Sequence, residues 1–315
     1  MWRWGGLASP GLVLALLVWR LGTGPFVGGL RAVDIRALAA AAGIVLLTTL
    51  CSAWRWRIVA RGLGVTLSLP AAVAAYYRSV FLNVTLPGGV VGDVHRGVSH
   101  GREVGDVSRA LRAVVWERSA GQVVQGVLTV AVLLALPSPV RSAMPVVAAT
   151  VVVVLVTAVV AARARPGRGR SAWARVRSTV AGDLREGLLA RRAWPVIALA
   201  SALVVAGHTA TFLIAARTAG TTAPLSEMLP IALLAMSGMV LPSVAGWGPR
   251  EGVVAWAFAA AGLGAERGVA TAVVYGVMVL FASLPGAAVL VVEWWRRTRS
   301  PSATGSRLRE GAIHA

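Results

Sequence analysis

The sequence has no lysine, a single cysteine and only 12 acidic residues in a chain of 315. Because Cys51 is alone, it can form no intrachain disulfide, and a metal site built on thiolates is excluded. Charged residues of both signs make up 14% of the chain, whereas an average soluble domain has about a quarter. This scarcity of charge argues against a soluble globular protein.

Motifs that bind nucleotides or metals are missing as well. No group of His, Cys and Asp residues has metal-ligand spacing, and no Walker loop suggests ATP-driven transport. The glycines at 24–29 follow no strand, so they do not form a dinucleotide motif. His95 and His100 lack the neighbouring acid and nucleophile that catalysis would need. We therefore expect no cofactor, no metal and no enzymatic activity.

What the chain does contain is apolar sequence. Hydrophobic residues make up 57%, and uncharged runs such as 146–162 and 269–292 approach or exceed the ~20 residues that cross the ~30 Å hydrocarbon core of a bilayer. Many of the 12 tryptophans lie at the ends of such runs, among them Trp54 and Trp56, as in an interfacial aromatic belt. The sequence predicts an all-α integral membrane protein.

The net charge of +19 comes from arginine alone. The arginines cluster at the ends of apolar runs, so they indicate membrane topology and contact with anionic lipid headgroups. On a soluble chain the same charge would suggest nucleic acid, which is not expected here as a partner.

The apolar segments fall into two kinds. About six are long enough for full spans, and they cover residues 7–27, 35–56, 114–136, 143–162, 195–216 and 268–292. Two more, 70–92 and 225–263, are interrupted at Pro87-Gly88-Gly89 and at Pro242. We predict that each of these two is a re-entrant broken helix, which enters and leaves the membrane on one side.

The positive-inside rule supports this topology. It places the arginine-rich segment 163–192, with a surface helix over 173–189, and the tail after Arg296 in the cytoplasm. With two re-entrant segments, both termini and the link 96–112 are also cytoplasmic. The arginines left outside are mainly Arg31, Arg36, Arg141, Arg217 and Arg267. We therefore expect a multi-pass protein of the plasma membrane.

The order span, span, re-entrant segment, span then occurs twice with opposite orientation, which is the pattern of an inverted-topology repeat. The predicted first repeat covers 1–141. The second covers 142–299 with the basic cytoplasmic loop 163–192, and a disordered tail follows at 300–315. The alternative is a bundle of about eight ordinary spans with two loose loops.

The two interruptions carry similar polar motifs, about half a chain length apart. The first holds Asn83, Pro87, Gly88, Gly89, Gly92, Asp93 and Arg96, and the second holds Gly246, Gly248, Arg250 and Glu251. A helix break at membrane depth frees backbone groups, and helix N-termini attract phosphate. We predict that Arg96 and Arg250 clamp an anion, with Asp93 and Glu251 orienting them or relaying protons. The alternative is an ordinary turn with an arginine at the lipid headgroups.

The span after Arg112 adds a polar stripe. Arg118, Gln122 and Gln125 share one helical face, and Glu117 lies beside them. Charges inside a span are costly and usually face the bundle interior or water. The stripe indicates a hydrophilic groove for a headgroup, or alternatively hydrogen bonds between helices. His208, alone in its span, is expected to be a packing residue.

These motifs carry a resemblance. The Trp54-Arg55-Trp56 start with Gly62-Leu63-Gly64, the run from Asn83 to Arg96, Glu117-Arg118 and Gly246-x-Gly248-x-Arg250-Glu251 resemble the flippase-like transmembrane family. That family includes the membrane half of bacterial lysylphosphatidylglycerol synthetases, uncharacterised UPF0104-type membrane proteins and relatives linked to polyprenyl-lipid glycosylation. The resemblance covers roughly residues 7–295. The second motif has Ala245 and Trp247 where the family pattern is richer in glycine.

The resemblance implies a lipid-moving function. We expect the chain to translocate an anionic or aminoacylated phospholipid, or a polyprenyl-phosphate-linked lipid, between leaflets. The soluble aminoacyl-transfer domain of the synthetases is not expected, because the tail after Arg299 is short. Two alternatives remain open: a secondary transporter of a small hydrophilic anion, and a scaffold for a glycosyltransferase that binds a cytoplasmic partner through the loop 163–192.

Overall fold

The computed structural model describes residues 2–163, 172–238 and 247–299. Within these ranges the chain is helical and has no β-strand, as the sequence predicts. Five helices are long and apolar enough to cross a membrane. They are α3 (Ile35–Gly62), α6 (Val107–Ala135), α7 (Met144–Arg163), α9 (Trp194–Thr218) and α12 (Ala265–Arg299). The chain is therefore an all-α, multi-pass membrane protein.

The first predicted span, 7–27, is not one continuous helix. The chain forms α1 (Trp2–Leu21) and α2 (Gly24–Ala32), which are bent by 97° relative to each other. Gly22 adopts a left-handed conformation with φ 72°, which glycine takes at no steric cost. Pro25 then lies in the first turn of α2, where its missing N–H leaves no bond unmade. These two residues turn the chain before it reaches the predicted end of the span.

Both predicted interruptions separate pairs of shorter helices. The first pair is α4 (Leu69–Thr85) and α5 (Val91–Val104), with Gly88 and Gly89 at φ 104° and 68° between them. The second pair is α10 (Leu225–Gly238) and α11 (Pro249–Ala260). Residues 239–246, which include Pro242 and Gly246, are outside the described part of the chain.

The first pair is held at very close range. A Cβ atom on Gly92 of α5 would lie 2.1 Å from the backbone oxygen of Ser79 on α4, a distance that no side chain could tolerate. Gly286 of α12 approaches α4 in the same way, 2.2 Å from the backbone oxygen of Tyr77. Glycine is therefore required where α4 is packed between α5 and α12.

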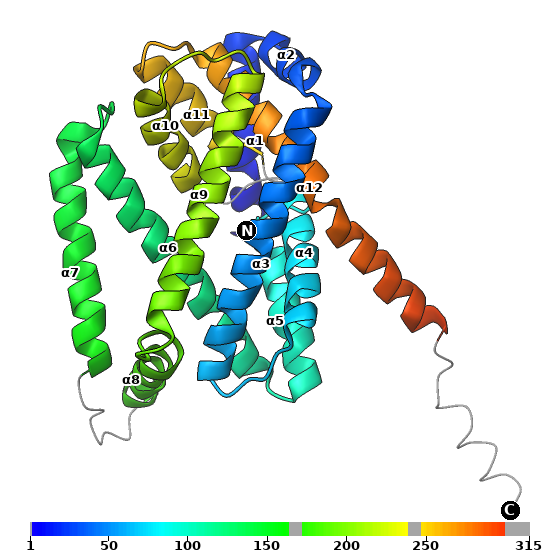
Figure 1. The fold of residues 1–315 in the computed structure, drawn as a ribbon, viewed down its shortest axis with the longest axis vertical. Helices are drawn as coiled ribbons and strands as arrows, with labels where there is room; N and C mark the ends of the chain where they lie inside the picture. Colours follow the sequence, from blue (N-terminus) through cyan, green and yellow to red (C-terminus); the bar gives the residue numbers. More distant parts are fainter. Residues whose placement is uncertain (1, 164–171, 239–246, 300–315) are drawn as a thin grey trace, which may run out of the picture.

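The two pairs lie at opposite ends of the molecule. Figure 1 shows α4 and α5 in the lower half and α10 and α11 in the upper half, with α3 and α9 running side by side through the middle. In each half of the sequence a long helix, a broken pair and a second long helix follow one another. This arrangement agrees with an inverted repeat, although the boundaries 1–141 and 142–299 stay a prediction.

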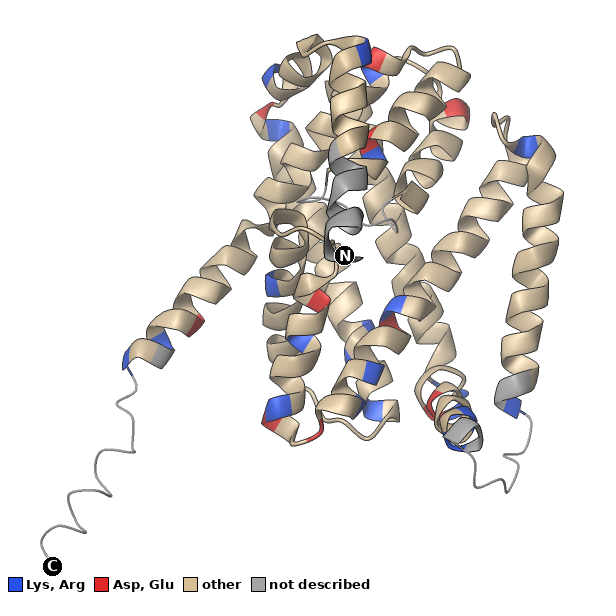
Figure 2. Ribbon diagram, turned by 180° about the vertical axis from the view of Figure 1, so that it is seen from behind, with Lys and Arg blue, Asp and Glu red and all other residues tan. Residues whose placement is uncertain are grey.

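The arginine-rich loop 163–192 is described from residue 172 onward. It contains α8 (Ala172–Asp183) and a π-helical turn, η2 (Leu184–Leu188), close to the predicted surface helix 173–189. A short 3₁₀ turn, η1 (Arg141–Ala143), precedes α7. The predicted disordered tail 300–315 is outside the described residues. Figure 2 shows many charged residues near the helix ends, with long uncharged stretches such as α7 between them.

Candidate functional site

A cavity of about 270 Å³ lies between the two broken pairs. It is lined by Ser52, Arg55, Tyr76, Val80, Asn83, Val84, Gly89, Arg118, Gly121, Gln122, Gln125, Ser201, Val204, Val205, His208, Met236, Gly238, Pro249, Arg250, Tyr275 and Val279. These residues come from α3, α4, α6, α9, α10, α11 and α12 and from the turn between α4 and α5. Both halves of the sequence therefore build its wall.

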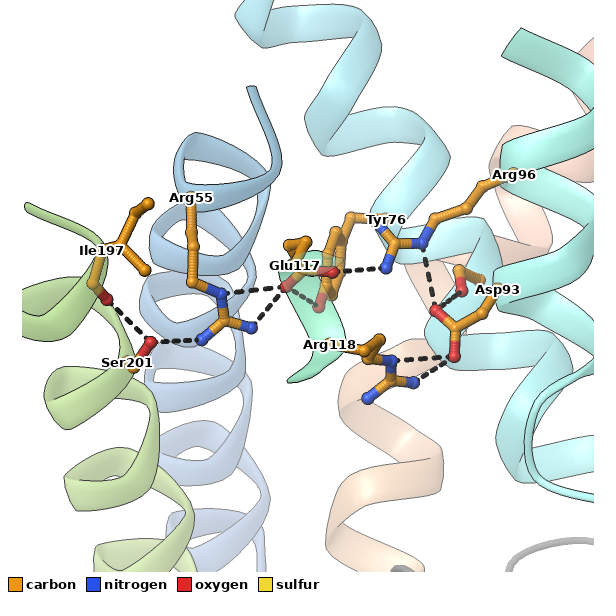
Figure 3. A network of polar contacts seen from close by, with 9 residues as sticks. Arg55, Tyr76, Asp93, Arg96, Glu117, Arg118, Ile197 and Ser201 are labelled. Atoms are coloured by element: carbon orange, nitrogen blue, oxygen red, sulfur yellow. Dashed lines mark hydrogen bonds and ion pairs between the residues drawn. The ribbon is translucent and has the colours of Figure 1, made fainter. Parts of the chain in front are cut away.

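Glu117 of α6 is the centre of a buried polar network behind this wall. Its Oε1 accepts hydrogen bonds from Arg55 Nε at 2.9 Å and from the Tyr76 hydroxyl at 3.2 Å, and it also pairs with Arg55 Nη2. Its Oε2 accepts from Arg96 Nη2 at 2.6 Å. Figure 3 shows Arg55 and Arg96 reaching Glu117 from opposite sides. Arg55 Nη1 continues to Ser201 Oγ at 2.9 Å, so the network joins α3, α4, α5, α6 and α9.

Asp93 of α5 is the second carboxylate of the network. Oδ1 accepts from Arg96 Nε at 3.0 Å and from Ser79 Oγ at 3.1 Å. Oδ2 accepts from Arg118 Nε at 2.9 Å, from Arg118 Nη2 and from Asn83 Nδ2 at 3.0 Å. The expected contact of Asp93 with Arg96 is thus present, and Arg118 shares the same carboxylate.

Asn83, the only asparagine of the chain, connects the two sides of the first break. Its Oδ1 accepts from the Gly92 backbone N–H at 2.8 Å, while its Nδ2 donates to Asp93. A carboxylate in the first turn also compensates the positive end of the helix dipole. The side chain of Asn83 therefore already binds the N–H group of Gly92 at the start of α5, and Asp93 supplies a negative charge there. At these two residues the helix N-terminus is not open to a phosphate, as the sequence had suggested it would be.

The second break has a simpler ion pair. Glu251 Oε1 accepts from Arg250 Nε at 3.0 Å, and its Oε2 accepts from the Gly248 backbone N–H at 2.7 Å, which caps the start of α11. The Arg250 guanidinium lies 5.1 Å from the centre of the Tyr275 ring and 5.7 Å from that of Trp247. Glu251 thus pairs with Arg250 at the cavity wall.

The cavity wall is positively charged. Arg55, Arg118 and Arg250 line it, whereas Asp93, Glu117 and Glu251 lie behind it and do not. The Arg118 side chain is 42% exposed, against 5% for Arg55 and 7% for Arg250. Arg118 is therefore the guanidinium that a ligand in the cavity can reach most easily.

The predicted site residues divide by position. Those that line the cavity are Asn83, Gly89, Arg118, Gln122, Gln125 and Arg250. Those buried behind it are Gly92, Asp93, Arg96, Glu117, Gly248 and Glu251. Pro87 is exposed and Gly88 half-buried, and neither contributes to the wall. Gly246 belongs to the segment outside the described residues.

Arg96 differs most from the expectation of a clamp pointing into the cavity. Its side chain is fully buried, and its guanidinium lies between the rings of Trp56 and Tyr76, at 4.6 Å and 4.4 Å from their centres. Because it pairs with both Asp93 and Glu117, it holds the two carboxylates in place. In this conformation Arg96 orients the cavity wall and does not contact the cavity.

Sequence reasoning missed Arg55 and misplaced Trp56. Trp56 was assigned to the interfacial aromatic belt because the run Trp54-Arg55-Trp56-Arg57 ends an apolar segment, and Arg55 was noted only as part of the family resemblance. Trp54 is 45% exposed, but Trp56 is fully buried. One signal could have found the site: Ser52 and Arg55 are three residues apart, which puts these polar side chains on one helical face.

His208 also differs from its expected role as a packing residue, because it lines the cavity. Its Nδ1 is 3.2 Å from the Tyr275 hydroxyl on α12. Neither residue has a partner nearby in the sequence, so only the packing of α9 against α12 could bring them together.

Comparisons with known proteins give one finding. A family model described as the lysylphosphatidylglycerol synthase TM region matches residues 4–286. The matched range includes both broken helix pairs and every residue that lines the cavity. No curated protein and no solved structure matches the chain.

Proposed function

The chain belongs to the lysylphosphatidylglycerol synthase TM region family, and on that premise we propose that it moves lipids with an anionic headgroup between the two leaflets of a membrane. The observation that carries this proposal is the cavity wall, on which Arg55, Arg118 and Arg250 face a space between two broken helix pairs.

The free-energy cost of placing the arginines Arg55, Arg118 and Arg250 inside a membrane protein supports the proposal. An arginine inside a span is expensive, and such residues usually mark the route of a substrate or an ion. Arg118 makes its described hydrogen bonds with Nε and Nη2, and Arg250 does the same, so in each side chain Nη1 has no partner among the described residues. A phosphate oxygen would accept charge-assisted hydrogen bonds from the N–H groups of these Nη1 atoms.

The position of the cavity supports movement between leaflets. Broken helices that meet near the middle of the bilayer are a recurring feature of transporters, in which one half of the molecule moves against the other. Here the first broken pair contributes Asn83 and Gly89 and the second contributes Gly238, Pro249 and Arg250. A rearrangement of either helix pair would open the cavity toward the end of the molecule at which that pair lies. We propose no catalytic role for these residues.

The proposal is tested in vesicles that contain the purified full-length protein and a trace of fluorescent phosphatidylglycerol. A quencher that does not cross membranes reports the label in the outer leaflet. We expect the protein to expose label that was in the inner leaflet, with or without an ion gradient, whereas protein-free vesicles do not. If no labelled lipid moves while radioactive sulfate or phosphate is taken up, the chain is a transporter of free anions.

We further propose that the protein resides in the plasma membrane, with both termini in the cytoplasm. The helix ends that carry the predicted outer arginines, such as Arg36 of α3, Arg217 of α9 and Arg267 of α12, meet at the upper end in Figure 1. The links after α3 and α5 lie at the other end with α8. The arginine-rich α8 end is the cytoplasmic one by the positive-inside rule.

Cysteine labelling tests this orientation. In a Cys51→Ala background, a cysteine at the exposed Thr222, which precedes α10, is expected to react with an impermeant reagent in intact cells. A cysteine at the exposed Val104, at the end of α5, should react only after permeabilisation. The reverse pattern would show that the protein is inserted the other way round, and labelling of both sites in intact cells would contradict the topology itself.

A further inference from the structure

Among the residues that the structure describes, no carboxylate lines the cavity. The three acids beside it, Asp93, Glu117 and Glu251, are each engaged by one or more guanidiniums behind the wall. The other acids in the part of the chain that the structure describes line no part of the cavity; they are Asp34, Glu103, Asp106, Asp183, Glu186, Glu227, Glu266 and Glu293. The segment 239–246, which the structure does not describe, contains no acid either.

An ammonium group in this cavity would therefore meet positive charge without a counter-charge. Moving an unpaired charge out of water is strongly unfavourable, and like charges at close range add to the cost. Arg118 is the most exposed of the three arginines, so an amine in the cavity would lie beside a guanidinium whose only carboxylate partner, Asp93, is shared with Arg96.

The charges at the site do not cancel. Four guanidiniums, those of Arg55, Arg96, Arg118 and Arg250, face three carboxylates, so one positive charge is left over. The ion pair of Arg78 with Glu293 lies outside this network and is neutral by itself. One negative charge in the cavity would balance the site, whereas a diphosphate would bring more negative charge than the site can balance.

Uncharged hydrogen-bonding groups complete the wall. Gln122 and Gln125 line the cavity and make no hydrogen bond to another described side chain, so their amides can both donate and accept. The volume of about 270 Å³ is below the range of about 300–1,000 Å³ that is typical of sites for whole drug-sized ligands. The cavity therefore suits a small polar headgroup, with the acyl chains left in the bilayer.

We propose that the cavity selects a headgroup with a single negative charge, a phosphodiester that carries hydroxyls and no amine, and that it discriminates against aminoacylated lipids. The proposal rests on the proposed function and narrows its substrate class. A lysyl ester of phosphatidylglycerol would add two ammonium groups to the phosphate, which would leave the bound site with a large excess of positive charge.

Competition binding tests the selectivity without requiring movement. Fluorescent phosphatidylglycerol is bound to the purified full-length protein in detergent and displaced by unlabelled phosphatidylglycerol, by lysyl-phosphatidylglycerol or by a short polyprenyl diphosphate. We expect phosphatidylglycerol to displace the probe at a concentration at least tenfold lower than either competitor. Equal or better displacement by lysyl-phosphatidylglycerol would overturn the proposal, as would failure of the probe to bind.

A carboxylate placed in the cavity supplies the second test. Gln122→Glu adds a negative charge to the wall with almost no change of shape, so the preference for phosphatidylglycerol over the lysyl lipid should fall at least tenfold. Thr222→Glu, which adds the same charge at an exposed position outside the cavity, should leave the preference unchanged. An unchanged preference in Gln122→Glu contradicts the selectivity. Selective binding without movement in vesicles would instead reject the proposed function and leave the selectivity standing.

Discussion

A Glu117→Gln variant is expected to lose much of its folding stability, about 3–5 kcal/mol, the usual cost of removing one partner from a buried ion pair. Glu117 is fully buried and accepts hydrogen bonds from Arg55, Arg96 and Tyr76. Glutamine preserves the shape but leaves two buried guanidiniums without this counter-charge. The measurement is the thermal unfolding midpoint of purified protein in detergent, together with the fraction that elutes as a single species.

A control variant and a rescue variant test whether the loss of stability comes from the buried ion pairs of Glu117. Gln125→Ala removes a cavity-lining side chain on the same helix without breaking any described hydrogen bond, and it should unfold at nearly the wild-type temperature. The double variant Arg55→Gln, Glu117→Gln removes one of the two stranded charges, so it should recover part of the loss. If Glu117→Gln unfolds at the wild-type temperature, the network does not hold α3, α5 and α6 together.

Arg118→Gln is expected to slow lipid movement by about 10–100-fold, since a hydrogen bond to a charged group contributes about 1.5–3 kcal/mol. Arg118 is the most exposed guanidinium of the cavity wall, so under the proposed function it is the one most accessible to a phosphate. The fold should survive, because Asp93 keeps its bonds from Arg96, Ser79 and Asn83. The initial rate in the vesicle assay measures the effect.

Lysine at position 118 is expected to give an intermediate rate of lipid movement. Arg118→Lys keeps the positive charge but loses the two parallel donors of a guanidinium, so its rate should lie between those of the wild type and Arg118→Gln. Arg36→Gln removes an exposed arginine outside the cavity and should move lipid at the wild-type rate. A folded Arg118→Gln protein with an unchanged rate would exclude Arg118 from the route.

The membrane character of the fold could be predicted from the sequence, because long uncharged runs have few structures open to them in a bilayer. Five of the six predicted spans are present as long apolar helices. The first is a bent pair of helices within its predicted range, because apolar composition does not determine where a helix bends. That bend depends on Gly22 in a left-handed conformation, and glycine in an apolar run can equally well be helical, as Gly43 is in α3.

The site could be predicted only in part. Asn83 and Arg250 were singled out because they lie next to helix breaks, and Arg118 because it belongs to a polar stripe on one helical face; all three line the cavity. Arg55 was not identified, because its contacts with Glu117 and Ser201 join helices that are distant in sequence. The burial of Arg96 could not be predicted either, since it depends on the rings of Trp56 and Tyr76 closing around it.

Chemical blockage of the cavity tests the central claim most directly. In a Cys51→Ala background, Gln122→Cys places a thiol on the cavity wall, and Val123→Cys places one on the neighbouring residue, which is 44% exposed and does not line the cavity. Both proteins are labelled with a bulky thiol reagent, and lipid movement is measured in vesicles. If lipid passes through the cavity, labelling at Gln122 abolishes movement and labelling at Val123 does not. Undiminished movement after complete labelling at Gln122 would show that lipid takes another route.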